Sequence, residues 1–171
     1  MVIIEETEDI FKTDCTIIAH QISNKGGMNG GLITKKIKKI FPHVYEEYKN
    51  FIKTNRSSSS MLGKVLYSDT KDGHIIANMV SLNNINNKKK TDYKAFEQCC
   101  ISIRNMINKK DTGIYLTDKF SVAFPYGIGS DKDDGEGDWG IIQNIIYKIF
   151  DQPEDTDIIC KIYKNIRGEN K

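Results

Sequence analysis

The sequence has few prolines, a single tryptophan and no long apolar run. Only 3 of its 171 residues are proline, and no stretch approaches the ~20 consecutive apolar residues of a membrane-spanning helix. The first residues, MVIIEETEDIF, turn acidic without the basic segment that opens a signal peptide. We therefore expect a cytoplasmic protein with no membrane partner, and the 39% hydrophobic and 28% charged residues are typical of a globular fold.

The sequence also lacks a strong charge of one sign and a metal-binding cysteine pattern. Its 25 basic and 23 acidic residues give a formal net charge of +2, which argues against general nucleic-acid binding through phosphates. The lysine run at 88–90 follows NNINN and is interpreted as a solvated loop. The four cysteines show no C-x-x-C spacing, so we expect reduced thiols, no metal site and no cofactor.

Apolar residues alternate along the chain between the spacing of a strand and that of a helix. Short apolar runs predict buried strands, helical spacing predicts helices, and TKDG between two apolar runs predicts a hairpin. The polar stretch 83–92 is interpreted as a connection. The expected strands are at 2–4, 16–20, 64–69, 74–81, 119–125 and 157–164, and the expected helices are at 29–41, 44–52, 93–107 and 139–150. This order predicts a single α/β domain over residues 1–171, with a mostly parallel sheet covered on both faces.

Two glycine-rich stretches each lie between an expected strand and an expected helix. The first, AHQISNKGGMNGGLITKKI, contains Gly26, Gly27, Gly30 and Gly31, and the second is PYGIGSDKDDGEGDW at 125–139. Ligands of open α/β sheets bind beyond the carboxyl ends of the strands, near backbone amides and helix N-termini. Neither stretch contains a P-loop or a G-x-G-x-x-G motif. The pair predicts a two-sided anion site suited to a diphosphate.

These stretches carry a resemblance to a known family. The segment from TEDIF through CTIIAHQISNKGGMNGGLITKKIKKIFPHVYEEY is similar to the first half of a macro domain, and FPYGIGSDKDDGEGDWGIIQNIIYKIF is similar to that family's second phosphate loop. The correspondence covers roughly residues 1–164 in the same order. It implies a three-layer α/β/α fold with a mixed, mostly parallel central sheet. It also implies binding of ADP-ribose or a derivative, as in the branch with terminal ADP-ribose glycohydrolases and ADP-ribose-1''-phosphate phosphatases.

The resemblance implies a set of binding residues. Asp9 would accept a hydrogen bond from the adenine amino group, with a backbone contact from Ile10 beside it. Trp139, just after the second stretch, is expected to support the site from the core. The residues expected around the diphosphate and distal ribose are Ser23, Gly27, Met28, Asn29, Gly30, Gly31 and Leu32 from the first stretch, and Pro125, Gly127, Ile128, Gly129 and Ser130 from the second.

The chain departs from the family pattern in two places. Members that form a covalent sugar adduct use a lysine where this chain has Met79 or Val80, so no amine is available there for a Schiff base. The second stretch is longer and more acidic than in relatives, which leaves open which aspartate takes the catalytic position. Counting back from the tryptophan favours Asp138 first and Asp134 second.

His20 closes the expected strand before the first stretch and lies close in sequence to Asn24. A histidine titrates near neutral pH and can move a proton or position a water, although a buried histidine in a purely structural role is the alternative. We predict that His20, Asn24 and Asp138 catalyse hydrolysis at the distal ribose, as a phosphatase for ADP-ribose-1''-phosphate or an enzyme that removes ADP-ribose from a macromolecule. The alternative is a non-catalytic protein that reads or sequesters ADP-ribose. In either case we expect a monomer.

Overall fold

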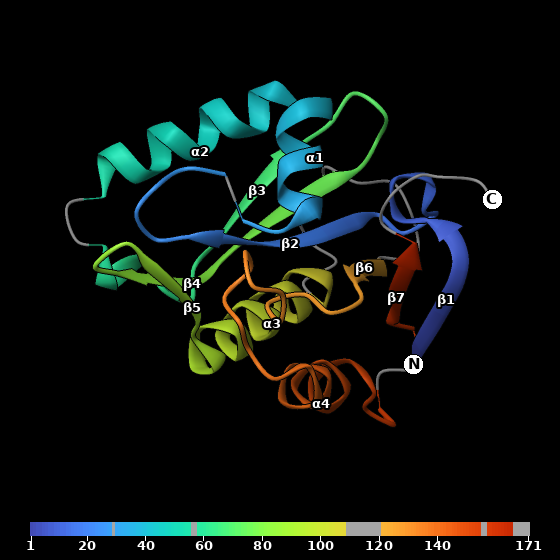
Figure 1. Cartoon of the computed structure of the whole chain (residues 1–171). Helices are drawn as coiled ribbons and strands as arrows, with labels where there is room; N and C mark the ends of the chain where they lie inside the picture. The colour runs from blue at the N-terminus through green and yellow to red at the C-terminus, as the bar shows by residue number, and fades with distance from the viewer. Residues whose placement is uncertain (29, 56–57, 109–120, 155–156, 166–171) are drawn as a thin grey trace.

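A seven-stranded mixed sheet forms the centre of the chain, with helices on both faces (Figure 1). The computed structural model describes residues 1–28, 30–55, 58–108, 121–154 and 157–165. The strand order is β1-β7-β6-β2-β4-β3, and β5 also pairs with β4. The α/β/α architecture expected from the sequence is therefore confirmed.

Every strand and helix expected from the apolar spacing is present among the described residues. Pro42, directly after the first expected helix, lies in the first turn of the second helix, where its missing amide hydrogen costs nothing. The elements are β1 (Val2–Asp9), the 3-10 turn η1 (Ile10–Lys12), β2 (Ile17–Ser23), α1 (Leu32–Ile40), α2 (Pro42–Thr54), η2 (Ser59–Met61), β3 (Val65–Asp69), β4 (Ile75–Ile85), β5 (Lys88–Thr91), α3 (Tyr93–Asn108), β6 (Ser121–Pro125), α4 (Trp139–Phe150) and β7 (Ile159–Asn165).

Five neighbouring strands run in the same direction. β1, β7, β6, β2 and β4 pair in parallel, whereas β3 and β5 are antiparallel to β4. The carboxyl ends of the parallel strands therefore lie along one edge of the sheet. Both glycine-rich stretches begin there, because one follows β2, the other follows β6, and these two strands are neighbours.

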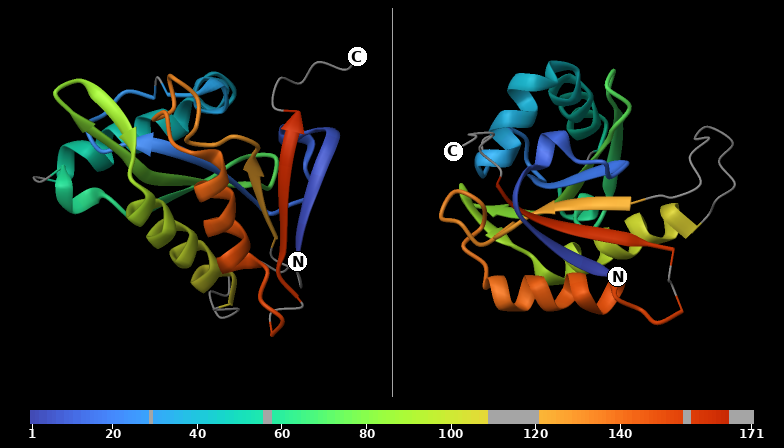
Figure 2. Two further views of the ribbon diagram at one scale, coloured as in Figure 1. Left: turned by 60° about the horizontal axis from the view of Figure 1, so that its bottom comes forward. Right: turned by 90° about the vertical axis from the view of Figure 1, so that its right-hand side faces the viewer.

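The sheet separates two layers of apolar core. Ile18 and Ile22 of β2 face α1 and α2, whereas Ile17 and Ala19 of the same strand face α3 and α4. Figure 2 shows the two helix pairs on opposite sides of the sheet. All seven residues of β2 are buried, as expected for a central strand covered on both faces.

The interpretation of residues 83–92 as a connection is wrong. β4 continues to Ile85 and turns at Asn86 and Asn87, which have φ of 50° and 62°, into β5. A two-residue turn with both residues in the left-handed region is the usual connection of a tight hairpin, and asparagine tolerates that region better than most residues. The lysines at 88–90 therefore belong to a strand.

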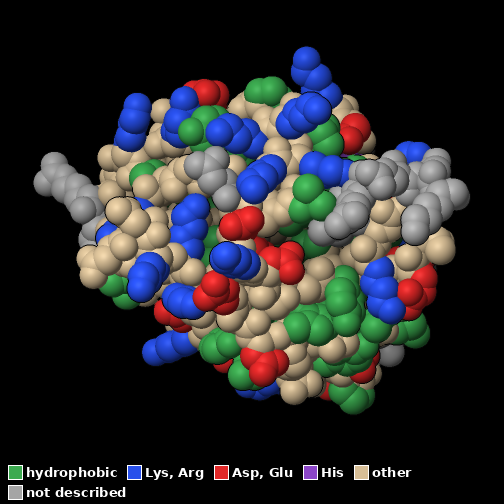
Figure 3. Space-filling view, viewed as in Figure 1, with side chains coloured by type: hydrophobic (Ala, Val, Ile, Leu, Met, Phe, Trp, Pro, Cys, Tyr) green, Lys and Arg blue, Asp and Glu red, His purple; other side chains and the backbone are tan. Residues whose placement is uncertain are grey.

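Among the helices of the described residues, none combines the length and hydropathy required to cross a bilayer. On the face viewed in Figure 3, basic side chains predominate over the upper part, where α1 and α2 lie, and acidic and basic side chains are mixed below it.

Candidate functional site

The two glycine-rich stretches meet at the carboxyl edge of the sheet. We call residues 24–31, after β2, the first loop and residues 126–138, after β6, the second loop. Between them lies a small, half-open pocket. Backbone and side chains from both loops and from the start of α1 line it: Gly31, Leu32, Ile33, Pro125, Tyr126, Gly127, Ile128, Asp131 and Asp134.

Glycine is needed in the second loop for its backbone conformation. Gly127 and Gly129 have φ of 74° and 75°, in the region that only glycine enters without strain. The turn is closed by a 3.0 Å hydrogen bond from the amide of Ser130 to the carbonyl of Gly127, which also accepts one from the serine hydroxyl at 2.6 Å. Gly127 therefore faces the pocket with bare backbone.

Asp134 is the residue that joins the two loops. Its Oδ2 accepts a 2.6 Å hydrogen bond from the amide of Gly129 in the second loop, and the amide of Gly31 in the first loop also interacts with the carboxylate. A Cβ at Gly31 would lie 3.1 Å from the Cβ of Asp134, so the side chain fits closely over a glycine. The side chain is only 3% exposed, and its Oδ1 has no hydrogen-bond partner.

Burial raises the pKa of Asp134 to about 7, because a charged carboxylate loses its hydration in this position. The amide of Gly129 opposes the rise, the negative charge of Asp131 adds to it, and the Gly31 amide and Lys89 oppose it. A carboxyl group with such a pKa can both donate and accept a proton near neutral pH. Among the acidic residues of the second loop, Asp134 therefore fits an acid–base role better than Asp138.

Asp138 has a different position from the one predicted for it. It is exposed, precedes α4, and its Oδ1 accepts a 3.3 Å hydrogen bond from the amide of Ile141. Its own amide donates to the hydroxyl of Tyr93 at 2.8 Å. The pocket lining does not include it. Asp138 is an N-cap, a role for which aspartate is strongly preferred.

His20 lies inside the molecule and is not paired with Asp138. Its Nδ1 is 2.9 Å from the hydroxyl of Thr34, its Nε2 is 2.5 Å from Oδ1 of Asn78, and the ring is fully buried. Burial lowers the pKa of His20 to about 4, although the bond to Asn78 opposes this. Both nitrogens are occupied and the ring is neutral near pH 7, so the geometry is that of the structural alternative.

Ser23 and Asn24 hold the first loop in place. The carbonyl of Ser23 accepts a 2.7 Å hydrogen bond from the hydroxyl of Tyr48, and its hydroxyl accepts one from the amide of Lys25 at 3.2 Å. Asn24 is also buried. Its Oδ1 accepts from the amide of Asn84 at 2.9 Å, and its Nδ2 donates to the carbonyl of Ser58 at 3.2 Å. The amide oxygen and the amide nitrogen of Asn24 are therefore both engaged in hydrogen bonds within the protein, whereas the catalytic hypothesis requires this side chain to act on the ligand.

Asp9 and Ile10 lie at the end of β1, on the same edge of the sheet as the pocket. Asp9 is partly exposed, and its Oδ1 accepts a 3.0 Å hydrogen bond from the amide of Phe11, while Ile10 is fully buried. β7 lies between β1 and β6, so a ligand that reaches both Asp9 and the pocket must extend along this edge.

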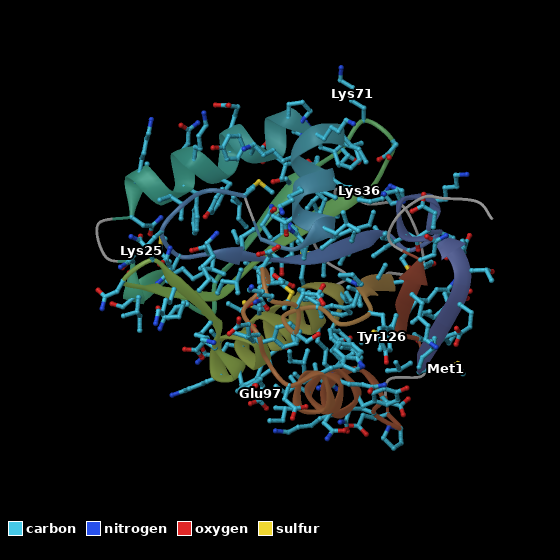
Figure 4. All side chains as sticks on the ribbon, in the orientation of Figure 1. Met1, Lys25, Lys36, Lys71, Glu97 and Tyr126 are labelled. Atoms are coloured by element: carbon cyan, nitrogen blue, oxygen red, sulfur yellow. The ribbon has the colours of Figure 1, made fainter. Side chains whose placement is uncertain are left out.

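The remaining predicted binding residues occupy three kinds of position. Met28 is buried in the core beside α1 and α2, and Asn29 lies outside the described residues. Leu32 is 38% exposed and lines the pocket, as does the buried Ile128. Tyr126, which was not predicted, is 42% exposed at the pocket (Figure 4). Its ring lies 4.8 Å from that of Trp139, which packs against the core as expected.

Thr91 of β5 is a supporting residue that sequence reasoning missed. Its hydroxyl donates to the carbonyl of Gly129 at 2.7 Å and accepts from Nε2 of Gln21 at 3.1 Å, and its amide donates to the carbonyl of Gly135 at 3.1 Å. Lys90 forms an ion pair with Glu136. The β4–β5 hairpin thus holds the second loop. In the sequence, the adjacent Asn86 and Asn87 were the signal from which this hairpin turn could have been predicted.

The comparisons with known proteins give matches only at the level of structure. No family model matches the sequence, and the curated proteins give no match. The macrodomain of Mycobacterium tuberculosis DarG is 19% identical and superimposes with a TM-score of 0.73 over 95% of this chain and 97% of its own. A Streptomyces coelicolor macrodomain protein is 16% identical, with a TM-score of 0.72 over 96% and 99%.

A third neighbour was solved with a ligand. A variant of the Oceanobacillus iheyensis macrodomain with ADPR is 17% identical, with a TM-score of 0.56 over 94% of this chain and 83% of its own. Identities this low establish the fold and leave the chemistry to be argued from the site. The chain has the macrodomain fold over nearly its whole length.

Proposed function

We propose that the chain binds ADP-ribose or a close derivative, with the diphosphate held between the first and second loops. The observation that carries this proposal is the pocket where Gly31, at the N-terminus of α1, meets Gly127. Backbone amides and a helix N-terminus both favour an anion. The fold shared with a neighbour solved with ADPR supports the same ligand class.

The pocket accounts for part of such a ligand. It is a small, half-open depression, far below the ~300–1,000 Å³ of pockets that enclose a whole drug-sized molecule. We assign the diphosphate and the adjoining sugar to the pocket. The adenine extends along the sheet edge toward Asp9 and Ile10, where it can meet the partly exposed carboxylate.

The binding proposal predicts that Gly127→Val weakens ADP-ribose affinity by at least about tenfold. A branched side chain is strained at positive φ, and its Cβ would lie 3.3 Å from the hydroxyl oxygen of Ser130, which closes the turn beside the pocket. Calorimetric titration measures the affinity. Gly73→Val is the matched control: Gly73 also has positive φ, at 89°, but nothing lies within 4 Å of its Cβ position in the β3–β4 turn. Equal affinity in the two variants would contradict the placement of the ligand.

We propose further that the chain hydrolyses its ligand at the distal ribose, with ADP-ribose-1''-phosphate ahead of ADP-ribosylated macromolecules. Asp134 is the proton-transfer group of this proposal, since it is the buried carboxyl of the pocket and its pKa is about 7. Water attacks the phosphorus, and inorganic phosphate and ADP-ribose are the products. A lysine adduct has no support, because Met79 and Val80 are side chains of the core.

Asp134→Asn is expected to reduce phosphate release from ADP-ribose-1''-phosphate by at least about 100-fold, the usual contribution of general acid–base catalysis. At pH 6 its affinity for ADP-ribose should stay within a few fold of the unmodified chain. Asp138→Asn retains a helix cap and discriminates between the two acids. If turnover is lost in Asp138→Asn and kept in Asp134→Asn, the assignment is wrong.

A specific observation favours a second function, binding without turnover. His20, Asn24 and Asp138, the predicted catalytic side chains, are all engaged in hydrogen bonds that hold the fold together. A protein that reads or sequesters ADP-ribose needs only the loops. Tight binding of ADP-ribose with no phosphate release from the 1''-phosphate would decide for this function.

A further inference from the structure

The carboxylate of Asp134 already interacts with backbone amides from both loops. It accepts a 2.6 Å hydrogen bond from Gly129 and interacts with the amide of Gly31 at the N-terminus of α1, a helix of nine residues. These two groups are the kind of donors that bind a phosphate at a helix N-terminus. A carboxylate at this position does what an oxygen of a bound diphosphate would do.

The second loop is folded so that it delivers this carboxylate. The amides of Asp134 and Glu136 both donate to the carbonyl of Asp131, at 2.9 and 3.0 Å, and the amide of Gly137 donates to the carbonyl of Gly129 at 2.7 Å. Glu136 takes a positive φ of 50° although it is not a glycine. The loop therefore accepts an unfavourable backbone conformation while it brings Asp134 over the first loop.

An independent observation indicates that the carboxylate lies in a ligand site. Its second oxygen, Oδ1, is buried and has no hydrogen-bond partner, and the residue lines the pocket. A buried acceptor without a partner is unfavourable, because it has lost its hydration and gained no hydrogen bond in exchange. The arrangement leaves an unsatisfied oxygen next to the space in which a ligand would be held.

We propose that Asp134 is an internal occupant of the diphosphate site, and that a diphosphate ligand binds only when this carboxylate releases the amides of Gly31 and Gly129. The inference deepens the proposed function and rests on it. Two negative groups compete for the same donors, so the charged carboxylate excludes the ligand. The neutral carboxyl group binds amides more weakly, because hydrogen bonds to charged acceptors are the stronger ones.

Competition of this kind makes binding depend on pH. Among the described residues, the charged groups that act on Asp134 are Asp131 of its own loop and Lys89 of β5, and the backbone of Gly31 and Gly129 lies against the carboxylate. With a pKa of about 7, the neutral fraction falls from about nine-tenths at pH 6 to a few per cent at pH 8.5. The apparent affinity for ADP-ribose should fall by about 30-fold over this interval, in proportion to that fraction.

Calorimetric titration with ADP-ribose at pH 6 and pH 8.5 tests the inference. Asp134→Ala removes the competing group and should bind equally at both pH values, at least about tenfold more tightly than the unmodified chain at pH 8.5. Asp134→Asn keeps the shape of the side chain and should also lose the pH dependence. Asp133→Asn replaces an exposed acid of the same loop that does not line the pocket, so this control should keep the pH dependence.

The outcomes separate this inference from the proposed function. If the unmodified chain binds ADP-ribose equally at both pH values and Asp134→Ala binds more weakly, the carboxylate supports binding, so the inference is wrong and the function stands. If no variant binds ADP-ribose, the function is wrong. Inorganic pyrophosphate at pH 8.5 then decides the inference: it should shift the amide resonances of Gly31 and Gly129 in Asp134→Ala and leave them unchanged in the unmodified chain, and no shift in the variant would overturn it.

Discussion

Gly135→Ala is expected to lower the free energy of unfolding by about 2–4 kcal/mol and to weaken ADP-ribose binding by at least about 100-fold. Gly135 has φ of 91°, where a side chain is strained, and its Cβ would lie 2.3 Å from the hydroxyl oxygen of Thr91 and 2.6 Å from its amide nitrogen. A hydroxyl can rotate away, but the backbone of β5 cannot. The second loop must therefore separate from the hairpin that holds it.

Denaturant unfolding and calorimetry with ADP-ribose measure the two effects of Gly135→Ala. Gly73→Ala is the control for backbone strain, because Gly73 has a similar φ of 89° and open space around its Cβ position. It should lose about 1 kcal/mol, the cost of the left-handed conformation alone, and keep its affinity. Equal losses in both variants would show that the contact with Thr91 contributes nothing.

The stability of the unmodified chain should change little between pH 7 and pH 5, because two buried groups titrate in opposite senses. The pKa of His20 is lowered to about 4, so its contribution is complete above its unfolded value of 6.5 and declines as the pH falls toward 4. The pKa of Asp134 is raised to about 7, so its contribution is complete below 3.8 and declines as the pH rises toward 7. From pH 7 to pH 5 each changes the free energy of unfolding by about 2 kcal/mol, with opposite signs.

Single substitutions should expose each titration. His20→Gln removes the stability that His20 loses on acidification, so the free energy of unfolding of this variant should rise by about 2 kcal/mol from pH 7 to pH 5. Asp134→Asn removes the opposite contribution, so the free energy of unfolding of that variant should fall by about 2 kcal/mol over the same interval. Denaturant unfolding at both pH values measures the change. His43→Gln, a replacement of an exposed histidine on α2, should leave the pH dependence of the unmodified chain intact. Parallel pH profiles for His20→Gln and Asp134→Asn would contradict both assignments.

The elements of the fold could be predicted because their signals are local. The residues of β2 form an unbroken buried run, and the apolar residues of α4 recur with helical spacing. Glycines between a strand and a helix indicated both loops. This signal is also local, because the ability to adopt a positive φ belongs to the single glycine residue. The β4–β5 hairpin was missed because β5 and the end of β4 are mostly polar and the turn, Asn86–Asn87, lacks glycine.

The positions of the site's polar side chains could not be predicted in the same way. Counting back from Trp139 favoured Asp138, but a residue directly before a helix is available to cap it, and Asp138 does so. Asp134 became the pocket acid because a positive φ at Gly135 and the pairing of Thr91 with the second loop turn it inward. His20 carried no local sign of Asn78, which is 58 residues away in sequence.

The amino-acid sequence by itself determined the order of the strands and helices apart from β5, the mostly parallel sheet and the two glycine-rich loops at its carboxyl edge. Each of these follows from apolar periodicity or from the conformational freedom of glycine over a few residues. Only the tertiary structure decided which acid and which histidine are buried and which strand supports the second loop. Burial and hydrogen bonding shift the pKa of a side chain through groups that are distant in the chain, and the sequence does not show which of these will become neighbours.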